Sequence, residues 1–146
     1  MHGVPVASTC ASAVLALRAL ALERIALFGA PWFLPELNDL GADYFRGQGF
    51  DVVSSASANL SKDSDRIAPA DVVSWVSRHV RNDAEAIFIG GNGFRAAAAI
   101  EPLEAAIGRP VLTSNQVLLW KLLACLGRLF EVTGFGQLFA HGAEVG

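Results

Sequence analysis

The sequence IFIGGNGFR, from Ile87 to Arg95, decides the expected fold of this chain. Residues 86–89 form a short apolar run, which is typical of a strand covered on both faces. The glycines that follow permit backbone conformations and close approaches that a side chain would block. We expect Asn92 or Gly93 to begin a helix, whose first backbone N–H groups have no partner within that helix.

This turn is also the expected position of a ligand. Free N–H groups at a helix start attract carboxylates and phosphates, and open parallel sheets bind ligands at the carboxyl ends of their strands. A tight strand-to-helix turn without a ligand is the alternative. Arg95 is open to two interpretations in the same way, because it can bind a substrate carboxylate or hold a neighbouring strand end.

Composition limits the class of protein. The chain has 146 residues, of which 53% are hydrophobic and 17% charged, and this suits one globular domain spanning 1–146. A net charge of -3 without a basic stripe argues against nucleic acid as a partner. The apolar runs are too short or interrupted to span a membrane, and no secretory signal is evident. We therefore expect a cytoplasmic protein.

Apolar strand-like and helix-like segments alternate along the chain with short connections. Expected strands lie at 24–28, 50–53, 86–89 and 109–113, and expected helices lie at 11–22, 33–47, 69–80, 93–107 and 114–126. Thr9 or Ser12 is expected to cap the first of these helices. This order predicts an α/β fold, a mostly parallel sheet with helices on both faces. The polar segment Ser54–Asp65 is expected to be a loop, either a lid or solvated surface.

Several polar or small residues fall at predicted strand ends and helix starts. None is an evident acid, base or nucleophile, so the pattern favours binding over catalysis and suits a neutral, backbone-rich pocket for carboxylates. These candidate lining residues are Thr9, Trp32, Ser54, Gly91, Asn92, Gly93, Ser114 and Asn115. Ser114 or Asn115 is also a candidate cap for the last helix.

Other chemistries have weaker support. Residues 91–96 match a dinucleotide-binding fingerprint loosely, but no acid follows the next strand to hold a ribose. No GxSxG motif or His/Asp/Glu pair at ligand spacing supports a hydrolase or a metal site. Cys10 and Cys125 are far apart without a CxxC, so we expect two buried, unpaired thiols.

The order of several segments resembles a known family. These segments are HGVPV from His2, AVLALRAL from Ala13, PW at Pro31 with Glu36 and Asn38, FR at Phe94, IEPLE from Ile100, GRPV from Gly108 and SNQ–W from Ser114 to Trp120. Together they are similar to the aspartate/glutamate racemase superfamily, in the branch of maleate cis-trans isomerase and arylmalonate decarboxylase. The resemblance covers nearly the whole chain.

The resemblance implies a fold of two similar α/β lobes with the active site between them, of which this chain is one lobe. It implies two cysteines, one per lobe, facing each other across a small carboxylate substrate, with no metal or organic cofactor. Lowered thiol pKa values support such chemistry. The turns at Asn92, Gly93, Ser114 and Asn115 correspond to those that surround the substrate's carboxylates.

Two departures from this family pattern predict impaired activity. The lobe that precedes His2 in the family is expected to be absent here, and the remaining family cysteine falls at Gly91. Trp32 replaces a tyrosine and removes a hydroxyl donor. The alternative function is a non-catalytic carboxylate-binding or oligomerising module.

The absent lobe also predicts a partner. Residues 114–146 would then pack on a missing lobe or on another chain, and the leucines of the last helix and Trp120 would be exposed. We expect a homo-oligomer, or a second chain that supplies the missing lobe.

Overall fold

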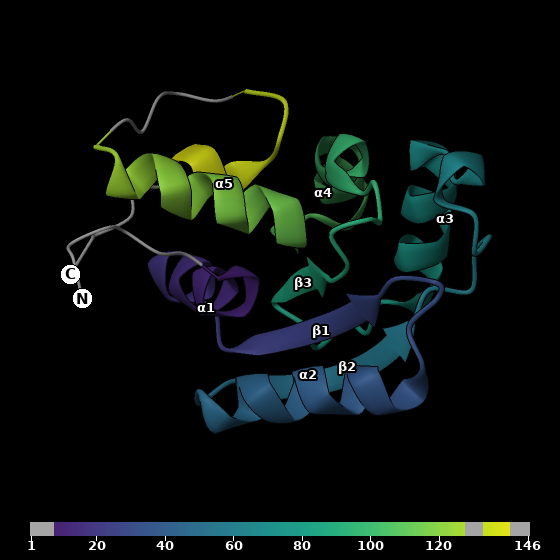
Figure 1. The fold of residues 1–146 in the computed structure, drawn as a ribbon, viewed down its shortest axis with the longest axis horizontal. Coiled ribbons are helices and arrows are strands. Elements are labelled where there is room, and N and C mark those ends of the chain that lie inside the picture. Colours follow the sequence, from purple (N-terminus) through teal and green to yellow (C-terminus); the bar gives the residue numbers. More distant parts are fainter. Residues whose placement is uncertain (1–7, 128–132, 141–146) are drawn as a thin grey trace.

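Four parallel strands form the centre of the protein. The computed structural model describes residues 8–127 and 133–140. Its strands are β1 (Arg24–Gly29), β2 (Asp51–Ser57), β3 (Ala86–Ile89) and β4 (Val111–Thr113), paired in the order β2-β1-β3-β4 (Figure 1). The apolar runs at β1 and β3 are buried because both have a neighbouring strand on each side and helices on each face.

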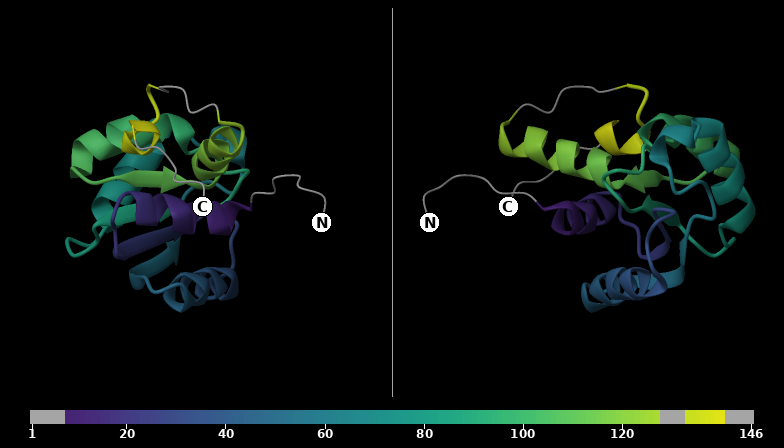
Figure 2. Two further views of the ribbon diagram at one scale, coloured as in Figure 1. Left: turned by 90° about the vertical axis from the view of Figure 1, so that its left-hand side faces the viewer. Right: turned by 45° about the vertical axis from the view of Figure 1, so that its right-hand side comes forward.

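Helices cover both faces of the sheet, as predicted (Figure 2). One core contains side chains of α1 (Thr9–Ala19), α2 (Pro35–Gly47) and α5 (Ser114–Cys125). The other contains side chains of α3 (Pro69–His79) and α4 (Ile100–Ile107). The protein therefore has the predicted α/β class with a parallel sheet. Among the described residues, the structure contains no helix with the length and apolarity that a membrane crossing requires.

Strand β2 is longer than the sequence predicted. It extends through the serine-rich residues to Ser57, so the first part of the expected loop is strand. The register of β2 against β1 shifts by one residue, because Ile25 pairs with Val52 and Ala26 pairs with Ser54. This β-bulge changes which side chains face α2. Hydrogen bonds to α2 and to the preceding turn stabilise the serines, a tertiary effect that outweighs their low strand propensity.

The segment after β3 also differs from the prediction, because no helix begins at Asn92 or Gly93. The chain makes a turn in which the Phe94 N–H donates to the Gly91 carbonyl, and a short 3₁₀ helix, η2 (Ala97–Ala99), leads into α4. Pro102 lies in the first turn of α4, where its missing N–H removes no helical hydrogen bond. The turn after β3 therefore provides no helix N-terminus for an anion.

The helix caps lie one residue earlier than predicted. Ser8, rather than Thr9 or Ser12, caps α1 by accepting from the Ala11 N–H. Thr113 caps α5 in a capping box with Gln116. Thr9 and Ser114 therefore occupy the first helical positions, and their side chains are free for other contacts.

The last helix is only partly as predicted. Trp120 is buried, with 1% of its surface exposed, because α1 and the short helix η3 (Gln137–Ala140) pack around α5. The expected exposure of Trp120 is wrong. The leucines on the outer face of the same helix are exposed, and Leu119 retains 48% of its surface. The opening segment 2–7 and residues 128–132 and 141–146 lie outside the described residues.

Candidate functional site

A cavity of about 440 Å³ lies at the carboxyl ends of β1 and β3, between α1 and α2. Its position agrees with the rule that parallel sheets bind ligands beyond their strand ends. The lining residues are Thr9, Cys10, Leu27, Phe28, Gly29, Phe33, Leu37, Asn38, Leu40, Gly41, Tyr44, Phe45, Ser55, Phe88, Gly90, Gly91, Asn92 and Ser114. Of the candidates from the sequence, the structure brings together Thr9, Gly91, Asn92 and Ser114.

One end of the pocket is polar because two helices begin there. Thr9 and Cys10 form the first turn of α1, and Ser114 is the first residue of α5. The first N–H groups of a helix carry partial positive charge and lack intrahelical partners. None of the described residues that line the pocket is acidic or basic. Helix starts and neutral polar groups are therefore its main means of holding an anion.

Ser114 joins the turn after β3 to the start of α5. Its hydroxyl oxygen accepts a hydrogen bond from the Gly91 N–H at 3.1 Å. Since that bond uses a lone pair, the Ser114 O–H remains able to donate to a ligand. Asn115 does not line the pocket. Its side-chain Nδ2 donates to the Asn92 carbonyl at 2.9 Å, so this residue holds the turn and neither caps α5 nor lines the pocket.

Gly91 adopts a conformation that few other residues tolerate. Its φ is +108°, and a Cβ placed there would lie 2.8 Å from the Ala30 Cβ, 3.4 Å from the Phe33 Cζ and 3.5 Å from the Phe94 Cβ. Ala30 is a fully buried core residue, so a Cβ at residue 91 would clash with it. Gly90 differs, because a Cβ there would meet only the rings of Phe33 and Phe88, at 3.8 Å.

Helix α2 supplies a second polar wall that the analysis of the sequence did not assign. The Asn38 Nδ2 donates to Ser57 Oγ at 2.6 Å, and Ser57 Oγ donates to the Phe33 carbonyl at 2.7 Å. Ser55, which lines the pocket beside Asn38, donates to the Asn38 carbonyl at 3.4 Å. Alternating serines in a strand are a sequence signal for such a polar face, but the bulge in β2 made the direction of that face unpredictable.

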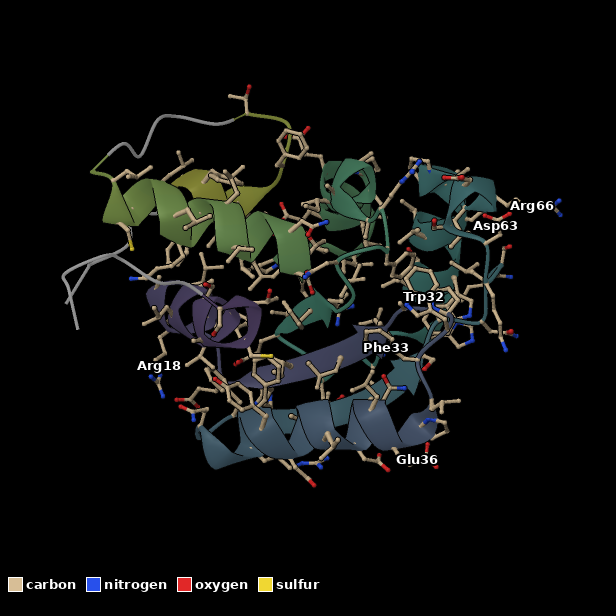
Figure 3. All side chains as sticks on the ribbon, in the orientation of Figure 1. Arg18, Trp32, Phe33, Glu36, Asp63 and Arg66 are labelled. Atoms are coloured by element: carbon tan, nitrogen blue, oxygen red, sulfur yellow. The ribbon has the colours of Figure 1, made fainter. Side chains whose placement is uncertain are left out.

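Apart from the phenol hydroxyl of Tyr44, the remainder of the pocket is apolar. Leu37, Leu40 and Tyr44 project from α2 at helical spacing, and each also keeps exposed surface. Figure 3 shows Phe33 beyond the carboxyl end of β1, near the start of α2, while the charged side chain of Glu36 points outward. A ligand in this pocket would place an apolar part against the rings and leucines and a polar part against the helix starts.

Cys10 is an exposed residue of the pocket, so its predicted burial is wrong. Partial desolvation by its neighbours raises the pKa of its thiol above the ordinary value. Cys125 is partly buried in α5, and both thiols are free. Across the described residues, no group of three or more His, Cys, Asp or Glu side chains is arranged to hold a metal ion.

Four other sequence candidates, Trp32, Ser54, Gly93 and Arg95, lie outside the pocket. Trp32 packs edge-on against Phe94, with ring centroids 6.2 Å apart, and its indole lies 3.4 Å from where a Gly93 Cβ would be. Ser54 has a buried hydroxyl that does not face the pocket. Arg95 pairs with Asp65 at 2.9 Å, with 72% of its side chain exposed, so it joins the turn to the loop after β2.

Known proteins are similar to this chain in sequence and in fold. The sequence model of the arylmalonate decarboxylase family matches residues 1–139. No curated protein matches the sequence. Among solved structures, a variant of maleate isomerase Iso from Pseudomonas putida S16, solved with maleate, superposes with a TM-score of 0.83 at 24% identity. That alignment covers 94% of this chain and 56% of the isomerase.

Two further structures agree with this match. An arylmalonate decarboxylase has a TM-score of 0.85 at 23% identity, covering 94% of this chain and 62% of that chain. Maleate cis-trans isomerase from Nocardia farcinica, bound to TRIS, has a TM-score of 0.81 at 22% identity, covering 92% and 55%. The chain thus spans less than two thirds of each of these proteins, which share its fold. Because the family model matches nearly its whole length, the chain belongs to the arylmalonate decarboxylase family.

Proposed function

We propose that the chain binds a small mono- or dicarboxylate in the pocket between α1 and α2. The observation that carries this proposal is that the first turns of α1 and α5 face the same pocket, at Thr9, Cys10 and Ser114. Each helix start stabilises an anion by about 0.3–1 kcal/mol, and a donated hydroxyl adds to that. The similar maleate isomerase structure was solved with a dicarboxylate, maleate.

We further propose that this chain does not perform thiol chemistry at the position where the family resemblance places a cysteine. Gly91 has no side chain to attack or to transfer a proton. Cys10 lies on α1, away from that position in the sequence, and its raised pKa keeps the thiol protonated near neutral pH. Isomerisation of maleate or decarboxylation of an arylmalonate by this chain alone is therefore expected to be impaired. We expect no organic or metal cofactor, and a cytoplasmic location.

The native thiols provide a direct test of binding. Cys10 lines the pocket and Cys125 does not, so alkylation of both by iodoacetamide can be followed by mass spectrometry in one sample. Succinate in the pocket is expected to slow alkylation of Cys10 and leave Cys125 unchanged. Equal rates for Cys10 with and without saturating succinate would overturn the proposal. An assay of maleate and phenylmalonate turnover completes the test, since rapid turnover would contradict the absence of thiol chemistry.

Self-association is a second property that we propose. Exposed leucines occur on α5, at Leu119 and Leu122, and at its C-cap residue Leu126, and apolar surface of this kind favours contact with another protein surface. Sedimentation velocity at low concentration is expected to show a homo-oligomer. Substitution of Leu119 and Leu122 by glutamate is expected to shift it toward monomer. A stable, compact monomer of the unaltered chain would contradict this proposal.

A further inference from the structure

The directions of the hydrogen bonds among Asn38, Ser55 and Ser57 determine which atoms this polar wall presents to the pocket. Ser57 Oγ has one hydrogen and uses it to donate to the Phe33 carbonyl at 2.7 Å. The atom of Asn38 that lies 2.6 Å from Ser57 Oγ must therefore be a donor, the amide nitrogen. The reverse amide orientation would place two acceptors against each other. The side-chain oxygen of Asn38 consequently points the other way.

That oxygen lies over Gly29, at the edge of the pocket. A Cβ at residue 29 would overlap Asn38 Oδ1, so glycine is required for this approach. Gly29 and Asn38 both line the pocket. Within the described residues, Oδ1 has no hydrogen-bond donor, and it does not belong to the fully buried polar atoms that lack a partner. Asn38 thus offers the pocket an open acceptor.

Ser55 adds a second hydrogen-bond acceptor to the same wall. Its hydroxyl hydrogen is directed to the Asn38 carbonyl at 3.4 Å, so its lone pairs are not used in that bond, and the residue lines the pocket. The pocket therefore has donors at the starts of α1 and α5 and acceptors on the wall between α2 and β2. A carboxylate oxygen placed against the acceptor wall would be repelled, while a hydroxyl could donate to it.

We propose that the acceptor wall at Asn38 and Ser55 selects a hydroxy-substituted carboxylate over an unsubstituted one. The proposal rests on carboxylate binding in this pocket and names its substrate class. A hydroxyl suits the wall better than an ammonium group does, because no acidic residue lines the described pocket to balance a positive charge.

The test compares ligands of similar size and equal charge. Binding of succinate, D-malate, L-malate and 2-methoxysuccinate is measured by their protection of Cys10 from alkylation and by calorimetry. One enantiomer of malate is expected to bind about 2- to 12-fold more tightly than succinate, the worth of one net hydrogen bond. The methyl ether, which keeps the oxygen but lacks the donor, is expected to lose that advantage.

Two variants examine the wall itself. Asn38→Ala removes the acceptor and is expected to bring the ratio of malate to succinate affinity to about one. Ser57→Ala leaves Asn38 in place but removes the group that orients its amide, and is expected to lower the ratio as well. Asn59 is an exposed asparagine outside the pocket, so Asn59→Ala is the matched control. This variant should keep the ratio of malate to succinate affinity of the unaltered chain.

The outcomes separate the two proposals. Succinate that binds as tightly as both malates would overturn the selection by Asn38 and leave carboxylate binding intact. An unchanged ratio in Asn38→Ala would overturn it too. If none of the four ligands protects Cys10 or produces heat, the proposed function itself fails.

Discussion

The Ser114 hydroxyl oxygen lies 3.1 Å from the backbone nitrogen of Gly91 and accepts its hydrogen bond. This contact joins residues 23 positions apart, and both line the same pocket. The turn after β3 therefore depends on α5 for its position, and the pocket depends on both. A ligand bound by Ser114 would be sensitive to changes in either segment.

Substitution of Ser114 is expected to weaken carboxylate binding. Ser114→Ala removes a hydroxyl donor at the anion end, and a hydrogen bond to a charged group contributes about 1.5–3 kcal/mol, so the Kd for succinate should rise by about tenfold or more. Calorimetric titration measures this. Arg95→Ala is the control, because the exposed Arg95 guanidinium pairs with Asp65 outside the pocket. This variant should bind succinate with an affinity within about twofold of that of the unaltered chain. A larger effect of the arginine variant would place the binding site elsewhere.

The two glycines after β3 are expected to respond differently to the same change. Gly91→Ala should lower the free energy of unfolding by about 1–3 kcal/mol, because φ is +108° and the new Cβ would meet Ala30. Gly90→Ala should change it by less than about 1 kcal/mol, since a Cβ there makes only ordinary contacts. Urea denaturation of both variants measures the difference.

A cysteine at each position extends this comparison to the pocket. Gly90→Cys is expected to place a thiol against the pocket rings of Phe33 and Phe88, where succinate would protect it from alkylation. The Cβ of Gly91→Cys would instead clash with Ala30, so gain of activity in that variant would require the backbone to move. Equal stability of Gly91→Cys and Gly90→Cys would contradict the conformation described for Gly91.

Glu104 ties the segment after α5 to the sheet. Its carboxylate accepts from the Val111 N–H at 3.0 Å and from the Gln137 N–H at 3.1 Å. Glu104→Ala leaves these donors without their acceptor and should lower the free energy of unfolding by about 1–3 kcal/mol, with faster hydrogen exchange at Val111. Glu101→Ala, which removes only the bond to the Gly134 N–H, should cost less. The reverse order would show that η3 is held mainly by its apolar contacts.

Stability should decrease in acid partly through Glu85. Its carboxylate accepts from the N–H groups of Arg24 and Glu23, which lowers its pKa below the ordinary 4.5. Because the folded pKa is the depressed one, this contribution is complete above pH 4.5 and is lost as pH falls through the lower folded value. Glu85→Gln should show a flatter dependence of unfolding free energy on pH between about pH 6 and pH 3 than the unaltered chain. Parallel curves would contradict this assignment.

The sequence predicts the features that depend on local apolar pattern. The strands around Ile25 and Ile87 and the helix starting at Pro69 lie where expected, because burial on both faces and proline at a first helical turn leave clear signals. The resemblance to the family, which rests on segments such as IEPLE from Ile100, is confirmed by the family match.

The features that the sequence does not predict depend on contacts between segments that are far apart in the chain. The burial of Trp120 requires α1 and η3, whose packing no local pattern gives. The candidates Thr9, Gly91, Asn92 and Ser114 meet in one pocket because strand ends and helix starts share an edge of the sheet. Asn38 was not among the candidates because its role depends on Ser57, 19 residues away.

The extra residue in β2 has a consequence for comparing relatives of this chain. Beyond the register shift, Ser55 and Ser57 pair with Leu27 and Gly29, and both form hydrogen bonds with Asn38 of α2. A homologue of the same length that lacks this bulge would pair residues 54 and 56 with Leu27 and Gly29, and would direct Ser54 and Ala56 to that side instead. Two proteins with identical serine tracts would then differ in ligand preference, so the presence of the bulge is more informative here than the identity of the serines.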